Sequence, residues 1–155
     1  MLTQDEILAI DHEVGLVPYK KAAVIEALKI VQGQRGWISD ESVQAIADYL
    51  EMSPAEVDSV ATFYNLIFRK PVGRHVILLC DSISCYVMGY QKLYKALQEQ
   101  LGGVKFGETT DDKRFTLLPN ACLGCCDRAP ALMVDEDLYQ DVTEEQLGEI
   151  LGKYQ

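Results

Sequence analysis

The sequence predicts two domains of different class: a small helical bundle over residues 1–71, followed by an α/β domain over residues 72–155. Up to Pro71, apolar residues recur at helical spacing in four segments that turn residues separate. Helices with such short connections suggest an antiparallel bundle. Beyond Pro71-Val72-Gly73, short apolar runs alternate with helical patterns in the order β-α-β-β-β-α. This change of period marks the expected boundary.

Capping signals mark the helices of the first domain. Thr3 and Glu6 have the spacing of a capping box, and Ser53-Pro54-Ala55-Glu56 combines a capping serine, a proline and a glutamate in the positions that open a helix. The expected helices run from Thr3 to Val14, over residues 20–34, from Ser39 or Asp40 to Leu50, and from Ser53 to Tyr64 or Ile67. No motif typical of catalysis falls on them, so we expect residues 1–70 to serve mainly in docking.

The second domain has the pattern of a thioredoxin-type sheet. Strands are expected over residues 75–80 and 115–118, with a helix over residues 88–101 and a polar connection over residues 104–114 between them. A hairpin over residues 131–134 and 138–140 follows, and Thr143 with Gln146 caps a last helix. A strand, a helix and a returning strand normally form a right-handed parallel unit. The hairpin and the last helix complete the sheet.

All five cysteines lie in two short stretches, each directly after an expected strand, in what we take to be polar loops. Cys80 and Cys85 belong to the first stretch, and Cys122, Cys125 and Cys126 to the second. If the two strands are parallel neighbours, both stretches emerge at the same edge of the sheet, where open α/β sheets bind ligands. Four thiols can then converge on one small volume.

The spacing of these cysteines favours an iron–sulfur cluster and leaves two alternatives open. Zinc ribbons prefer two C-x2-C knuckles. Here the spacings are C-x4-C and, for Cys122 with Cys126, C-x3-C; wider loops suit a [2Fe–2S] core whose two irons each take two thiolates. The alternatives are a structural zinc module and a thiol–disulfide protein that uses Cys122 and Cys125 as a C-x-x-C pair.

Composition excludes several classes of partner. The 155-residue chain has a formal net charge of −10, and acidic residues outnumber basic ones on both sides of Pro71, which argues against nucleic acid and anionic lipid. The start of the chain has no secretory signal pattern, and no apolar run is long enough to span a bilayer. An odd number of cysteines favours reduced thiols or metal ligands. We therefore expect a cytoplasmic protein without direct membrane insertion.

The cysteine motifs, read with two upstream stretches, resemble a known family. These stretches are Cys80-Asp81-Ser82-Ile83-Ser84-Cys85, Cys122-Leu123-Gly124-Cys125-Cys126-Asp127, Gly33-Gln34-Arg35-Gly36-Trp37-Ile38 and Val60-Ala61-Thr62-Phe63-Tyr64. Together they are similar to the E subunits of bacterial NADH–quinone oxidoreductase, respiratory complex I. The likeness covers essentially the whole chain. Similar domains serve NAD-linked hydrogenases and formate dehydrogenases, so an equivalent diaphorase subunit is the alternative.

The resemblance implies a thioredoxin-like [2Fe–2S] ferredoxin domain behind an N-terminal helical domain. It implies one [2Fe–2S] cluster held by Cys80, Cys85, Cys122 and Cys126, and gives Cys125 no ligand role. The implied partners are the flavoprotein subunit that binds FMN and NADH, and other subunits of the peripheral arm on the cytoplasmic face of the inner membrane. The chain would thus be part of an oxidoreductase without catalytic activity of its own, and it has no Gly-x-Gly-x-x-Gly loop.

Other prominent residues have simpler interpretations. Trp37, Phe63 and Tyr64 are expected to pack in the core or between domains. His12 and His75 have no second ligand at a useful spacing and are not expected to bind metal. Asp127 and Arg128 are expected to hydrogen-bond within their own loop.

Overall fold

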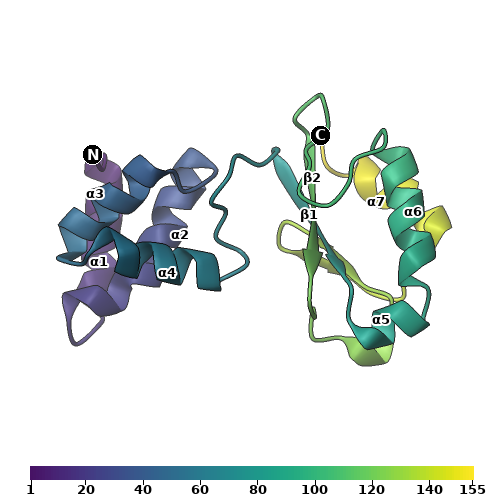
Figure 1. Cartoon of the computed structure of the whole chain (residues 1–155), viewed down its shortest axis with the longest axis horizontal. Coiled ribbons are helices and arrows are strands. Elements are labelled where there is room, and N and C mark those ends of the chain that lie inside the picture. Colours follow the sequence, from purple (N-terminus) through teal and green to yellow (C-terminus); the bar gives the residue numbers. More distant parts are fainter. The chain divides into compact units, whose positions relative to one another are not determined.

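The computed structural model describes residues 1–155, which form two compact units, Met1–Pro71 and Val72–Gln155 (Figure 1). The first unit is helical and the second contains every strand. Each unit has its own hydrophobic core. None of the helices is both long enough and apolar enough to cross a membrane.

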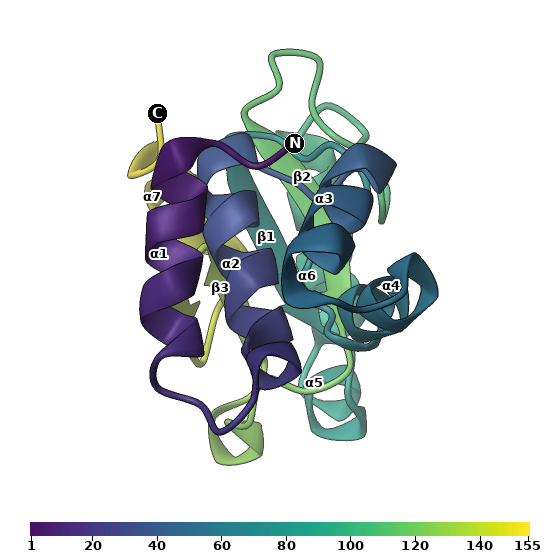
Figure 2. The same cartoon turned by 90° about the vertical axis from the view of Figure 1, so that its left-hand side faces the viewer.

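The first unit is built from four α-helices and one short 3₁₀ helix. They are α1 (Gln4–Val14), η1 (Lys20–Ala23), α2 (Val24–Arg35), α3 (Asp40–Leu50) and α4 (Pro54–Phe63). α1 lies beside α2, and α3 beside α4 (Figure 2). Every α-helix contributes to one core, which includes Ile10, Leu28, Val31, Ile46, Leu50, Val57 and Ala61. The helical spacing of apolar residues predicts this core.

Three helices begin at the capping residues that the sequence predicts. The capping boxes of Thr3 with Glu6 and of Ser53 with Glu56 are both formed. Ser39, the first of the two residues considered, caps α3 through a hydrogen bond from the Ser42 N–H to its Oγ at 3.2 Å.

Two helix ends differ from expectation. The segment expected to be helical over residues 20–34 starts as a 3₁₀ turn, and α2 begins only at Val24. No side chain caps this start, since Tyr19 makes no capping hydrogen bond. α4 ends at Phe63 because Tyr64 is extended and the following chain is bound to α2, where the Gln32 side chain bonds the Leu66 carbonyl and the Phe68 N–H.

A buried ion pair ties α1 to α2. The Glu6 side chain is fully buried and accepts two hydrogen bonds from Arg35, at 2.7 Å from Nε and 2.6 Å from Nη2. Arg35 also donates to Ser42 Oγ at 3.2 Å. The Arg35 guanidinium lowers the pKa of Glu6 and outweighs the opposing effect of burial. Arg35, within Gly33-Gln34-Arg35-Gly36-Trp37, therefore organises the helical unit itself.

The prediction that Phe63 and Tyr64 belong to the core is wrong. Phe63 is 79% exposed and Tyr64 is 44% exposed, and their rings contact each other edge to face with centroids 5.1 Å apart. Trp37 is half-buried. Packing between domains stays a prediction for these aromatic residues.

The second unit is a mixed four-stranded sheet with the order β2-β1-β3-β4. Its strands are β1 (His75–Cys80), β2 (Phe115–Asn120), β3 (Leu132–Val134) and β4 (Asp137–Tyr139). β1 pairs in parallel with β2 along its whole length, from His75 opposite Phe115 to Cys80 opposite Asn120. β3 is antiparallel to both β1 and β4. The predicted parallel unit and hairpin are confirmed.

Helices cover one face of this sheet (Figure 1). The covering helices are α6 (Tyr90–Gln100) and α7 (Leu147–Gly152). The short helix α5 (Ile83–Val87) and the 3₁₀ turns η2 (Cys126–Arg128) and η3 (Glu144–Gln146) lie in the connections. α6 and α7 share a core with the sheet that includes Ile77, Leu79, Leu93, Leu97, Leu117, Leu147 and Ile150. β1 pairs with a strand on each side. Its carboxyl end is therefore the best supported position at the edge of the sheet where β1 and β2 end.

Three local features of this unit differ from the predictions made from the sequence. α5 lies inside the stretch taken for a polar loop, and β2 continues two residues past Leu118. The hairpin turn is shorter than expected, since Asp135 takes a left-handed conformation with φ 52° and Asp137 already belongs to β4. Each feature spans only a few residues, which is too short for a periodic pattern to show.

Candidate metal centre

The first pair of cysteines is buried at the end of β1. Cys80 is the last residue of β1 and Cys85 lies in α5, with 2% and 1% of their surfaces exposed. The Cys80 N–H donates to the Ala131 carbonyl at 3.2 Å, which continues the bonding of β1 toward β3. The expectation that Cys80 ends its strand is confirmed, whereas the expectation that Cys85 lies in a polar loop is wrong. Regular backbone fixes both positions.

The two thiols of this pair interact, and their protonation is shifted in opposite directions. Burial works against ionisation of Cys80, but hydrogen bonds from the Ser82 hydroxyl and from the Ser82 and Leu123 N–H groups lower its pKa overall. Burial and the neighbouring Cys80 thiol raise the pKa of Cys85. Cys80 is therefore the residue of this pair that becomes a thiolate first.

The second pair is exposed and lies after β2. Cys122 and Cys126 bring their Sγ atoms to 3.6 Å, and Cys126 begins η2. The Gly124 N–H donates to Cys122 Sγ at 3.3 Å. Gly124 has φ +81°, a left-handed conformation that favours glycine. The hydrogen bond between the two thiols raises the pKa of Cys126, because the proton on Cys126 is stabilised by the neighbouring sulfur of Cys122.

The sheet brings the two pairs to one edge. Cys80 stands opposite Asn120 in the parallel register, and the Asp81 N–H donates to the Asn120 carbonyl at 3.0 Å. α5 contacts η2, and both lie beyond the ends of β1 and β2 (Figure 1). Besides Cys122, the nearby Ser84 hydroxyl and the charge of Cys80 act on the pKa of Cys126, the first lowering it and the second raising it. The two stretches lie at the same edge of the sheet, and a single site for the four thiols stays a prediction.

Cys125 occupies a different environment from its two neighbours in sequence. Its side chain is 8% exposed and packs in a small cluster with Cys80, Cys85, Ala129 and Ala131. Cys122 is in contact with Cys126. The C-x-x-C pair considered from the sequence is therefore split between an exposed thiol and a buried one.

A salt bridge holds the second cysteine stretch from outside. Arg128 donates from Nε to Asp141 Oδ2 at 2.7 Å, and the Asp141 N–H donates back to the Arg128 carbonyl at 2.9 Å. Arg128 bonds within its own loop through its backbone, since its N–H donates to the Cys125 carbonyl at 3.0 Å, but its side chain bonds outside the loop. No pattern in the sequence predicts this contact, because Asp141 lies beyond the hairpin.

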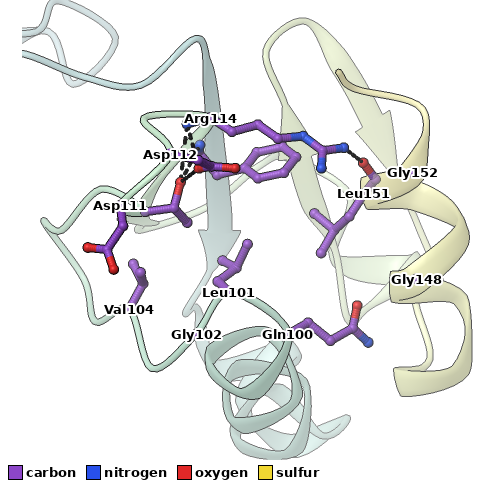
Figure 3. Close-up of a pocket in the computed structure, with 12 residues that line it drawn as sticks. Gln100, Leu101, Gly102, Val104, Asp111, Asp112, Arg114, Gly148, Leu151 and Gly152 are labelled. Carbon is purple, nitrogen blue, oxygen red and sulfur yellow. Dashed lines mark hydrogen bonds between the residues drawn. The ribbon is translucent and has the colours of Figure 1, made fainter.

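A cavity of about 500 Å³ in the same unit is separate from the cysteines. It is lined by the end of α6, by residues around Arg114 and by α7 (Figure 3). The Arg114 guanidinium donates to the carbonyls of Leu151 and Tyr154, and the Asp112 carboxylate accepts from the Thr110 hydroxyl and the Arg114 N–H. The bonds to Leu151 and Tyr154 stabilise the end of α7, and the bonds to Asp112 stabilise the turn before β2.

The donor set at the sheet edge consists of two thiol pairs. No three Cys, His, Asp or Glu side chains converge as a ready-made site for a single metal ion. A [2Fe–2S] core needs two thiolates on each iron, whereas structural zinc takes four ligands around one ion. The residues present, two pairs of soft sulfur donors side by side, fit the two-iron group.

Known proteins are similar to this chain over nearly its whole length. The family model for thioredoxin-like [2Fe–2S] ferredoxins matches residues 10–155. The E subunit of NADH-quinone oxidoreductase from Escherichia coli K12 is 51% identical over 153 residues, which cover 99% of this chain and 92% of the relative. The E subunit from Pseudomonas aeruginosa PAO1 is 48% identical over 154 residues, with the same two coverages.

A solved structure shares the fold. An NAD⁺-reducing [NiFe]-hydrogenase in its H2-reduced state matches with a TM-score of 0.70 and 22% sequence identity, over 84% of this chain and 22% of the hydrogenase chain. At this identity the likeness concerns the fold alone. The family model and the relatives, together with the paired cysteines at the sheet edge, establish that this chain belongs to the thioredoxin-like [2Fe–2S] ferredoxin family.

Proposed function

We propose that this chain is the electron-carrying iron–sulfur subunit of an NADH–quinone oxidoreductase, of the same type as the E subunits among its relatives. The observation that carries the proposal is the paired arrangement of Cys80 with Cys85 and of Cys122 with Cys126 at one sheet edge. About half of the residues are identical to those of relatives named as this subunit, over nearly the whole chain. The function is electron transfer within an oxidoreductase complex.

Each pair of cysteines holds one iron of a [2Fe–2S] cluster. When bound, the cluster supplies a one-electron carrier. The chain itself provides the thiolates, buries one side of the site through Cys80 and Cys85, and places the Gly124 N–H and the Ser82 hydroxyl within hydrogen-bond distance of the sulfur atoms. Burial and hydrogen bonding are the means by which a protein adjusts such a centre.

The partner is the flavoprotein subunit that binds FMN and NADH. A hydride delivers two electrons at once, so a flavin must divide the pair before a one-electron carrier can take part. This chain has no glycine-rich dinucleotide loop. Its place is with the other peripheral-arm subunits on the cytoplasmic face of the membrane. The fold shared with the hydrogenase also supports an equivalent diaphorase subunit as the second candidate.

The purified chain tests this proposal. We expect two irons and two sulfides per chain, a red-brown absorption spectrum, and a paramagnetic signal after reduction. NADH alone should neither bleach the absorption nor reduce ferricyanide, because no flavin is present. A colourless zinc protein, or a protein that cycles between dithiol and disulfide without iron, would contradict the proposal. Both parent complexes require a flavoprotein, so copurification with hydrogenase subunits, and not with the flavoprotein alone, identifies the second candidate.

We also propose that residues 1–71 and 72–155 are separate domains, and that the cluster needs only the second. The separate hydrophobic cores support this division, as does the restriction of all cysteines to the second unit. A fragment of residues 72–155 should then fold and bind the cluster, while the helical domain should be needed to capture the flavoprotein. A fragment that stays unfolded and free of iron would refute the division.

A further inference from the structure

The short stretch between Cys80 and Cys85 carries two serines that are both half-buried, while their neighbours Asp81 and Ile83 are exposed. Ser82 occupies the N-cap position of α5, with φ −65° and ψ 165°. Serine at this position ordinarily uses its hydroxyl to accept a hydrogen bond from the first turn of the helix. The Ser82 side chain makes no such capping bond. Its hydroxyl is therefore available for another partner.

That partner is the sulfur of the first ligand. In the structure the protonated Cys80 thiol donates to Ser82 Oγ at 3.4 Å. A thiolate sulfur bound to iron carries no proton, so the hydroxyl must be the donor in this contact once the cluster is in place. Because the Cys80 side chain is only 2% exposed, water cannot easily supply the same hydrogen bond.

We propose that Ser82 is a positioning residue that sets the reduction potential of the centre by donating its hydroxyl hydrogen to Cys80 Sγ. The inference rests on the proposed function, since it requires a cluster ligated by Cys80. Adding one electron makes the centre more negative, and a hydrogen-bond donor stabilises the more negative state more strongly. The hydroxyl therefore raises the potential, and its removal lowers it.

The second pair of cysteines has a donor of its own. The Gly124 N–H lies 3.3 Å from Cys122 Sγ. This donor belongs to the backbone, so a substitution at Ser82 leaves it in place. The Ser82 variants therefore change the hydrogen bonding of the first pair alone.

The test is a redox titration of the full chain, followed by visible absorption and by the paramagnetic signal of the reduced state. Ser82→Ala should keep its iron and sulfide but should show about three- to tenfold less reduced protein at a fixed ambient potential. A tenfold change corresponds to about 59 mV for a one-electron couple. Ser82→Thr should retain the wild-type potential, since it keeps the hydroxyl. Ile83→Ala is the matched control, because Ile83 is adjacent and 75% exposed.

A second pair of variants keeps the test decisive if Ser82→Ala folds poorly. Ser82→Thr and Ser82→Val have nearly the same shape and differ in the hydroxyl. At a fixed ambient potential, their ratios of reduced to oxidised protein should therefore differ by the same factor. Equal potentials in loaded hydroxyl and apolar variants would overturn the proposal. Loss of the cluster from both apolar variants would also overturn it, since the hydroxyl would then hold the loop together. A wild-type chain without iron would instead refute the proposed function.

Discussion

The two cysteine pairs differ in how the fold holds them. Cys80 and Cys85 are buried at 2% and 1% exposure on a strand end and a helix, whereas Cys122 and Cys126 are exposed after β2. In the first pair, Cys80 is held by the sheet, because β1 is bonded on both sides, and Cys85 is held by α5. The second pair is held by local bonds and by the Arg128–Asp141 salt bridge. The comparison indicates that regular structure fixes the positions of Cys80 and Cys85, whereas a loop supplies Cys122 and Cys126.

The largest expected effect is loss of the cluster when a cysteine of either pair is replaced, because both pairs are needed despite their difference in burial. Serine in place of Cys85 or of Cys126 should abolish the cluster, because an alkoxide is a poorer ligand than a thiolate for iron–sulfur centres. Iron and sulfide content with the paramagnetic signal of the reduced protein measures this. Cys125→Ser is the control and should retain the cluster. Loss of the cluster in Cys125→Ser with retention in Cys126→Ser would reverse the assignment of the fourth ligand.

Alkylation of the metal-free protein compares the pairs directly. At pH 8, Cys122 and Cys126 should react with iodoacetamide about tenfold faster or more than Cys80 and Cys85, because only the second pair is accessible. Peptide mass spectrometry over a time course gives the rate at each residue. Equal rates in the folded protein would show that α5 opens readily and that the first pair is not preformed.

In the absence of metal, substitutions in the two pairs should change the free energy of unfolding by different amounts. Cys85→Ser places a hydroxyl in the apolar cluster around Ala129 and Ala131, and should lower the free energy of unfolding by about 1–3 kcal/mol. Cys126→Ser lies at the surface and should change it by less than about 0.5 kcal/mol. Urea unfolding of the metal-free variants measures both. A larger loss in Cys126→Ser would mean that the exposed stretch, and not the buried one, supports the fold.

The smallest expected effect lies within the exposed pair. Cys122 raises the pKa of Cys126, since a proton on Cys126 is stabilised by the neighbouring sulfur. Removal of that sulfur in Cys122→Ser should bring the pKa of Cys126 back down, so that more of it is thiolate at pH 8. Its alkylation rate should then rise about two- to fivefold, with the increase vanishing at a pH well above 9. A slower reaction in the variant would show that Cys122 activates Cys126 instead.

The sequence was sufficient for the parts of this fold that depend on long patterns. β1 has the expected bounds, since five of its six residues are buried and the apolar run is uninterrupted. The parallel pairing of β1 with β2 follows from the long connection between them. These two facts bring Cys80 close to the stretch after β2, so the shared edge of the candidate site was also predictable.

The unequal burial of the pairs was not predictable, because it depends on α5. Ile83, Val87 and Met88 are apolar but 75%, 73% and 61% exposed, so the apolar residues of this helix do not mark its buried face. A helix of only five residues also has too few positions for a period to appear. The salt bridge from Arg128 to Asp141 was hidden for another reason, since it joins residues on either side of the hairpin.

The positions of two residue types make each half of this chain observable by its own signal. Trp37, the single tryptophan, lies in Met1–Pro71, and all five cysteines lie in Val72–Gln155. Indole fluorescence therefore follows melting of the helices, while cluster colour follows the sheet. Heating one unmodified sample and recording both signals reveals whether the halves lose structure together or in succession, with no dye or engineered probe required.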